Sequence, residues 1–267
     1  MRLTGIHRPA IEDVIELSPI EMLHPGGMEL TRRAAEIAGL QPGMHVLDVS
    51  SGRGTQSIFY AKEYGVQVTG VDISEDMLKS ARIQAEKAGL EQQVKFEWGD
   101  SQELKFADDT FDAAINECAV GIPDDSQKVL DEMVRVTKPG GAIVIHESTW
   151  RKKLTQEEKT DIAERYGTTP FEYEEWQEML KKAGVKDIIT EFDQWSKPEM
   201  FWNTRADRVV TDHRKVLSLA EKSITALNVF KKFGFKGVLK AFQNEKIFYQ
   251  IVLQGKLGYC LFKGVKA

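Results

Sequence analysis

Cysteine is scarce in this chain, and long apolar runs are absent. The 267 residues include two cysteines, Cys118 and Cys260, too few for a disulfide framework or a cysteine metal cluster, so we predict no metal site. Nowhere does an apolar run reach the roughly eighteen residues of a membrane-spanning helix. The first residues also lack the apolar stretch of a secretory signal. The composition therefore predicts a globular, cytoplasmic protein.

Charge is distributed unevenly along the chain. The formal net charge is −5, but residues 196–267 hold 14 Lys and Arg against 5 Asp and Glu. An acidic body thus precedes a basic C-terminal segment. Such a segment is typical either of contact with an anionic partner or surface, or of lysine-rich helices that face water, and the sequence leaves both open.

Two apolar segments, 44–49 and 67–72, end next to groups that suit a nucleoside. Such runs are typical of buried parallel strands, whose carboxyl ends carry the ligand site of an open α/β sheet. The first is followed by Gly52 and Gly54, which let the backbone approach a bound group closely. The second ends at Asp72, which can accept hydrogen bonds from a ribose diol. The pattern therefore predicts a nucleoside cofactor, although the third glycine of a dinucleotide-binding loop is absent.

Further motifs follow in order along the chain. A Gly-Asp pair comes after an apolar run at 94–98, and more apolar runs occupy 111–116 and 141–147. With the first two segments, this order over residues 44–147 resembles the class I S-adenosylmethionine-dependent methyltransferases, in particular the small-molecule branch (methyltransferase type 11) that includes ubiquinone- and menaquinone-biosynthesis enzymes. The resemblance implies S-adenosyl-L-methionine as cofactor and S-adenosyl-L-homocysteine as product.

The resemblance also implies which residues hold the cofactor. In this family the first acid-and-glycine loop holds the methionine part, the second strand ends at the ribose, the third ends at the adenine and the fourth ends beside the methyl-donor site. The residues at these places are, in that order, Asp48, Ser50, Gly52 and Gly54, then Asp72 and Ile73, then Asp100 and Ser101, and finally Asn116 or Glu117. Ser50 departs from the usual glycine and adds a side chain where the backbone meets the cofactor.

Strands and helices alternate, which predicts an α/β fold with a parallel sheet and right-handed crossovers. Helical patterns occupy 28–38, 54–64, 75–89, 125–137 and 171–183, and a sixth strand is expected at 187–192. With the terminal antiparallel hairpin that the resemblance implies, we expect a Rossmann-like, seven-stranded, mostly parallel sheet with helices on both faces. The expected parts are an N-terminal helical flap at 1–40, a cofactor-binding core at 41–196, a helical lid insertion between strands six and seven at 197–256 and a terminal strand at 257–267.

Methyl transfer from a sulfonium is an in-line displacement, so the chain must supply mainly alignment and, for a protonated acceptor, a base. Candidate catalytic residues at the expected strand ends are Glu117, His146 and Glu147, and His24 can reach in from the flap. Because successive strand residues point to opposite faces, only one of His146 and Glu147 faces the site, and we favour Glu147. A purely structural role is the alternative for each.

The segment 230–242 interleaves aromatic residues with lysines. One interpretation is an amphipathic stretch that grips a lipid-like acceptor or rests transiently on a membrane surface. The other is that the aromatic residues only pack the insertion onto the body. The insertion also resembles the substrate lid of cyclopropane-fatty-acid synthases.

Three functions compete. The first is methyl transfer to a small-molecule acceptor of apolar or anionic type, such as a quinone precursor, a lipid or a thiol. The second is a protein or RNA methyltransferase that docks through the basic C-terminal segment, although no nucleic acid is expected because Asn116 is not followed by the Pro-Pro-Tyr of base-modifying families. The third is an NAD-dependent oxidoreductase, disfavoured because the only Tyr-x-x-x-Lys, Tyr259 to Lys263, falls in an expected strand.

Overall fold

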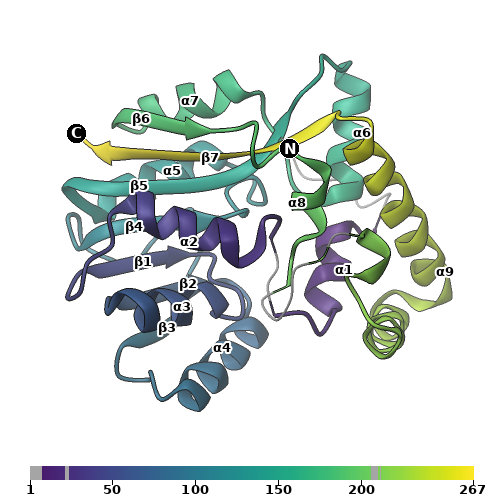
Figure 1. Ribbon diagram of the computed structural model, residues 1–267, viewed down its shortest axis with the longest axis horizontal. Coiled ribbons are helices and arrows are strands. Elements are labelled where there is room, and N and C mark those ends of the chain that lie inside the picture. The colour runs from purple at the N-terminus through teal and green to yellow at the C-terminus, as the bar shows by residue number, and fades with distance from the viewer. Residues whose placement is uncertain (1–7, 22–23, 206–209, 211) are drawn as a thin grey trace.

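The computed structural model describes residues 8–21, 24–205, 210 and 212–267. Its centre is a seven-stranded sheet in the order β3-β2-β1-β4-β5-β7-β6 (Figure 1). Neighbouring strands from β3 to β5 pair in parallel, and β7 is antiparallel to both β5 and β6. The strands are β1 (His45–Val49), β2 (Gln67–Asp72), β3 (Val94–Trp98), β4 (Phe111–Glu117), β5 (Thr137–Trp150), β6 (Val185–Glu191) and β7 (Leu257–Lys266). The expected Rossmann-like, mostly parallel sheet is confirmed.

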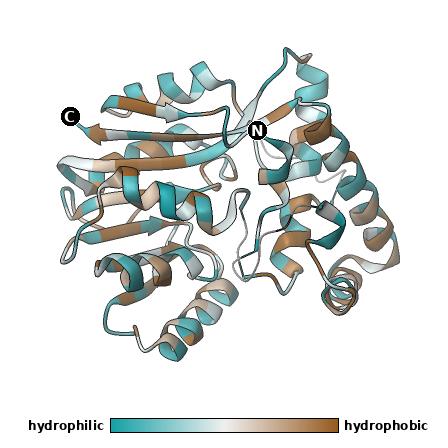
Figure 2. Cartoon of the chain, in the orientation of Figure 1, coloured by the Kyte–Doolittle hydropathy of each residue, from teal (hydrophilic) through white to brown (hydrophobic). Residues whose placement is uncertain are grey.

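Helices cover both faces of the sheet because successive strand residues are apolar on both sides. In β1, Val46 packs into one buried cluster and Leu47 into another. The first cluster contains residues of α2 (Gly27–Ala38), α3 (Thr55–Tyr64) and α4 (Glu75–Ala88). The second contains residues of α5 (Ser126–Val136) and α7 (Tyr173–Lys182). Figure 2 shows the resulting pattern, with hydrophobic colour on the strands and hydrophilic colour on the outer turns of these helices.

The remaining helices form a cap at one end of the sheet (Figure 1). They are α1 (Ile11–Leu17), α6 (Gln156–Tyr166), α8 (Pro198–Trp202), the 3₁₀ turn η1 (His213–Lys215) and α9 (Leu219–Leu253). Two asparagines of α9 bond the two ends of α1. Asn228 Nδ2 donates to the backbone oxygen of Leu17, at the C-terminal end, and Asn244 Nδ2 donates to that of Pro9, just before the N-terminal end, both at 3.0 Å. The cap therefore joins the N-terminal part of the chain to the segment between β6 and β7.

The long helix α9 is two helices that meet at Gly234, whose φ of 69° and ψ of −173° interrupt the helix. Among the described helices, none combines the length and the apolar character needed to cross a bilayer.

The structure differs from the sequence-based expectation in three places. Residues 156–166 form a helix that was not expected, and β5 extends over 137–150 instead of 141–147. The helix at 27–38 was expected in the flap, but it packs against β5 and β7. The boundary between the sheet-covering part and the N-terminal cap therefore lies before α2 and not at residue 40.

Candidate active site

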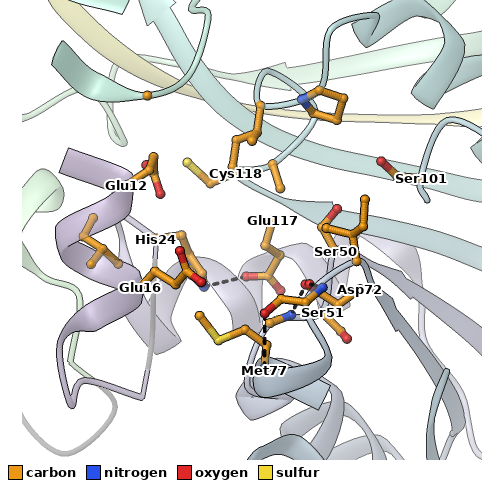
Figure 3. Close-up of a pocket in the computed structure, with 18 of the residues that line it drawn as sticks. Glu12, Glu16, His24, Ser50, Ser51, Asp72, Met77, Ser101, Glu117 and Cys118 are labelled. Carbon is orange, nitrogen blue, oxygen red and sulfur yellow. Dashed lines mark hydrogen bonds and ion pairs between the residues drawn. The ribbon is translucent and has the colours of Figure 1, made fainter. Parts of the chain in front are cut away.

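A cavity of about 470 Å³ lies between the carboxyl ends of the central strands and the cap. Figure 3 shows Ser50, Asp72 and Ser101 on one side of it, and Glu12, His24 and Cys118 on the other. The cavity is lined by eight of the predicted site residues, His24, Ser50, Gly52, Asp72, Ile73, Asp100, Ser101 and Glu117. The other four, Asp48, Gly54, Asn116 and Glu147, are not among its lining residues.

The loop after β1 turns sharply under the cavity. Ser50, Gly52 and Gly54 have φ values of 61°, 54° and 74°, in the left-handed region. A Cβ at Gly54 would lie 2.3 Å from the ring of Phe96, so glycine is required there for the loop to pack on β3. Gly54 thus shapes the loop, whereas Ser50 and Gly52 face the cavity.

Asp72 ties this loop to the loop after β2. One carboxylate oxygen accepts from the backbone N–H of Gly52 at 2.9 Å, and the other accepts from that of Ser74 at 2.8 Å. Burial raises the pKa of Asp72, and the hydrogen bonds from Ser74 and Gly52 oppose this shift. Each oxygen keeps a lone pair for a further donor, so the carboxylate can accept bonds from a diol in the cavity.

Asp48 lies below the loop and not on the cavity surface. Its Oδ2 accepts a hydrogen bond from Ser57, while its Oδ1 is buried without a partner among the described residues. The Oγ of Ser51, which does line the cavity, is also buried and without a partner. Burial raises the pKa of Asp48 to about 8 against the opposing bond from Ser57. Under the loop, Asp48 Oδ1 and Ser51 Oγ therefore have hydrogen-bonding capacity that the described residues do not use.

Asn116 holds the end of β4 in place. Its Nδ2 donates to the backbone oxygen of Val49 at 3.0 Å, and its Oδ1 accepts from the backbone N–H of Ala119 at 2.9 Å. The side chain is fully buried, so Asn116 positions the strand ends around the site from below.

Glu117 is the centre of a buried hydrogen-bond network. Its Oε2 accepts from Thr31 Oγ1 at 2.8 Å and lies 2.8 Å from His24 Nε2 and 2.9 Å from His146 Nε2. Its Oε1 accepts from the hydroxyl of Tyr60. His146 reaches Glu117 because the β4–β5 register places the two residues opposite each other. Both therefore project from the same face of the sheet.

The charges in this network are set by burial and by the pairing. Burial works to lower the pKa of His24, but the Glu117 carboxylate outweighs it and the pKa is raised. Burial works to raise the pKa of Glu117, but His24 and His146 hold it well below its usual value. Burial lowers the pKa of His146, which stays neutral. The cavity wall thus contains an imidazolium–carboxylate pair of His24 and Glu117, and neither partner is suited to accept a proton near neutral pH.

The same three side chains are a possible donor set for a cation. One nitrogen of His24, one of His146 and a Glu117 oxygen lie within 4.8 Å of one another, and two histidines with one carboxylate suit divalent transition metals. However, the hydrogen bonds described above already satisfy Glu117, and the charge of His24 balances it. The network is complete without a cation, and the absence of a metal stays a prediction.

Glu147 occupies the opposite face of β5 from His146. Its Oε1 accepts from the backbone N–H of Val120 at 2.6 Å, and the side chain is buried. Burial raises its pKa to about 8 although several backbone N–H groups lower it. We expected Glu147, and not His146, to face the site. In the structure His146 contacts Glu117, which lines the cavity, whereas Glu147 holds the loop after β4.

Several residues at the site were missed by the sequence reasoning. Glu12, Ile15 and Arg53 line the cavity, and Tyr60 belongs to the Glu117 network. Glu12 and Ile15 lie on α1, a helix of the expected flap whose bounds were not predicted. Tyr60 is separated by 57 residues from Glu117, and no local pattern reports such a contact.

Comparison with known proteins places the chain in a family. Residues 40–195 match the family described as "Methyltransferase domain". Phosphoethanolamine N-methyltransferase 1 of Arabidopsis thaliana is 28% identical over 193 residues, 72% of this chain, and the chain spans only 39% of that relative.

Two solved structures have the same fold. The [4+2]-cyclase SpnF has a TM-score of 0.75 at 21% identity, with 97% of this chain and 92% of SpnF covered. Phosphoethanolamine N-methyltransferase 2 of Haemonchus contortus, in complex with S-adenosyl-L-methionine, has a TM-score of 0.73 at 22% identity, with 98% of this chain and 59% of that chain covered. Such identities establish the fold alone. The match over residues 40–195, more than half of the chain, shows that it belongs to the methyltransferase domain family.

Proposed function

We propose that this chain transfers a methyl group from S-adenosylmethionine to a small-molecule acceptor by in-line displacement inside the cavity. The proposal depends on one observation. A single cavity is lined by Asp72 and Asp100 on one side and by His24 and Glu117 on the other, so a cofactor and an acceptor can occupy it together. A volume of about 470 Å³ is that of a small-molecule site.

The cofactor half offers a group for each part of the nucleoside. Asp72 accepts from the ribose hydroxyls, Ile73, which is 63% exposed, covers one face of the adenine, and Asp100 with Ser101 meets its polar edge. The unused polar atoms of Asp48 and Ser51 lie at the loop that would hold the methionine part. These residues fit S-adenosylmethionine, which supplies an activated methyl on a sulfonium.

The rest of the site aligns the reacting atoms. Holding a nucleophile in line with the methyl supplies roughly 7–11 kcal/mol in favourable cases. The negative charge of Glu117 stands where the fourth strand ends, and its low pKa keeps that charge at neutral pH. We assign to Glu117 and His24 the wall of the methyl-donor site, and to the cap the exclusion of water.

The acceptor half supports an apolar acceptor over an anionic one. Ile15 of α1 and Cys118 supply apolar surface on the Glu12 side (Figure 3). Arg53 lines the same cavity, but its guanidinium already donates to the backbone oxygens of residues 16, 18 and 20. A quinone precursor or a lipid-like molecule fits this lining better than a phosphorylated one.

The basic aromatic segment 230–242 is proposed as a membrane-surface contact. Phe230, Phe235 and Phe242 are 52%, 66% and 59% exposed, so they do not pack the insertion onto the body. Lys231, Lys232 and Lys236 beside them are exposed as well. An exposed stripe of rings and ammonium groups suits an anionic lipid surface, from which an apolar acceptor can be drawn.

The test is transfer of labelled methyl from S-adenosylmethionine into an extract of the source cells, followed by solvent partition. Label in small molecules supports the proposal, and the organic phase in particular supports an apolar acceptor. Label in protein or RNA favours docking of a macromolecule through the basic segment instead. A chain that neither transfers label nor binds S-adenosylhomocysteine contradicts the proposal.

A further inference from the structure

Glu12 is a carboxylate in the cavity lining to which the proposed function gives no role. It projects from the first turn of α1 into the acceptor half, near Cys118 and away from Asp72 (Figure 3). It makes no hydrogen bond or ion pair with another residue in the described part of the chain. A Cβ at Gly167 would lie 3.0 Å from Glu12 Cβ, so the backbone at the α6 C-terminus packs closely against the base of the Glu12 side chain.

The charge around Glu12 is negative. Asp13, Glu16 and Glu164 also line the cavity. Of the two arginines in the lining, Arg53 is engaged by backbone oxygens, and Arg8 lies 3.7 Å from Asp13. The acceptor half therefore suits a cationic group and opposes an anionic one.

Glu12 is also the cavity group best suited to exchange a proton. Burial raises its pKa to about 8, and the charges of Glu147 and Asp13 add to the shift. By contrast, the pKa of Glu117 is held well below its usual value. The titratable or charged groups that face Glu12 from the surrounding elements are Arg8, Asp13, Cys118, Glu147, Glu164 and Tyr166. A base whose pKa lies near the working pH is the efficient one.

We infer that the acceptor is an amine with an apolar body, which enters as an ammonium ion, and that Glu12 binds this ion and takes its proton. The inference rests on the proposed function. An ammonium nitrogen has no lone pair, so the N–H bond must break first, with the proton passing to a Glu12 oxygen. The free nitrogen pair then forms the N–C bond, and the C–S bond breaks with its electrons left on sulfur. The apolar lining at Ile15 and Cys118 receives the body of the amine.

The test compares three probes of equal chain length, n-hexylamine, 1-hexanol and hexanoate, by calorimetric titration of the protein saturated with S-adenosylhomocysteine. At pH 7.5 hexylamine is expected to bind at least tenfold more tightly than either of the others. Glu12→Gln should remove most of this preference. Glu178→Gln, the same change on the exposed outer surface of α7, should leave it intact.

The pH dependence tests the proton step. Glu12 loses its proton near pH 8 and an alkylammonium loses its proton near pH 10.4, so the wild-type affinity for hexylamine should rise as pH increases from 7 to 9, and Glu12→Gln should lack this titration step near pH 8. The same pH dependence around pH 8 in the wild type and in Glu12→Gln contradicts proton acceptance by Glu12.

Failure of this inference is distinguishable from failure of the proposed function. S-adenosylhomocysteine binding with no preference for the amine, including no binding of any probe, overturns the amine inference alone. An unchanged preference in Glu12→Gln does the same. Absence of S-adenosylhomocysteine binding by the wild-type chain overturns the proposed function and this inference with it.

Discussion

At the scale of single residues, Ser50 carries backbone strain at the centre of the site. Its φ of 61° lies in the left-handed region, which costs a residue with a Cβ about 1–2 kcal/mol. Ser50→Val should therefore lower the free energy of unfolding by at least about 1 kcal/mol, whereas Ser50→Gly should change it by less than about 0.5 kcal/mol, since relief of strain offsets the greater freedom of glycine in the unfolded chain. Urea denaturation measures both. Equal losses in the two variants would contradict the strain.

Glu147 gives the fold a pH dependence. Burial raises its pKa to about 8 in the folded chain, from about 4.5 in the unfolded chain, so the folded state binds more protons between these values. The contribution of Glu147 to the free energy of unfolding is present in full below pH 4.5. It is lost as pH rises to 8, with a slope of up to about 1.4 kcal/mol per pH unit. Glu147→Gln keeps an acceptor for Val120 N–H and cannot ionise.

The advantage of Glu147→Gln over the wild type in the free energy of unfolding should therefore grow between pH 5.5 and pH 7.5. Denaturation at the two pH values measures it. A constant difference would mean that Glu147 does not titrate in this window. Methyl transfer should survive the substitution, because the side chain does not line the cavity.

The positions of Asp72 and Asp100 could be predicted because each lies at the end of a recognisable strand, and the structure places both in the cavity lining. Their contacts with a cofactor stay a prediction. The hydrogen-bond network of Glu117 could not be predicted in this way, because Thr31, Tyr60 and His146 lie 86, 57 and 29 residues away from Glu117 in sequence. Only the strand register and helix packing bring them together.

At the scale of elements, the core strands and helices were predictable because burial on both faces produces continuous apolar runs with glycine at their ends. The cap was harder. Helix α1 has only seven residues and a single-sided cap, in which the Asp13 carboxylate accepts from the N–H of Ala10 at 2.9 Å, and packing against α9 also stabilises it. Helix α6 did carry a local signal, a capping box of Thr155 and Glu158.

The exposed stripe on α9 makes a prediction about membranes. The chain should co-sediment with vesicles that contain anionic lipid, and much less with neutral ones, because each lysine near such a surface contributes about 1 kcal/mol. Phe235→Ser should reduce this binding about tenfold or more, since a buried phenylalanine contributes about 1.5–3 kcal/mol. Ile83→Ser, on the exposed surface of α4 outside the stripe, is the control and should have no effect. Equal binding by the two variants would contradict the membrane contact.

At the scale of the whole molecule, the cavity depends on parts from both ends of the chain. The carboxyl ends of β2 and β4 supply Asp72 and Glu117. Helix α1 supplies Glu12 and is held by Asn228 and Asn244 of α9. The β6–β7 insertion thus supports the Glu12 side of the cavity from outside.

The central claim, that the carboxyl edge of the sheet holds S-adenosylmethionine through Asp72, is tested most directly by titrating S-adenosylhomocysteine into the wild type and Asp72→Ala. The wild type should bind, and Asp72→Ala should lose at least tenfold in affinity, since hydrogen bonds to a charged group contribute about 1.5–3 kcal/mol. Asp193→Ala, at a side chain that is 94% exposed, should bind as the wild type does, and circular dichroism should confirm that both variants are folded. No binding by the wild type, or equal binding by a folded Asp72→Ala, would contradict the claim.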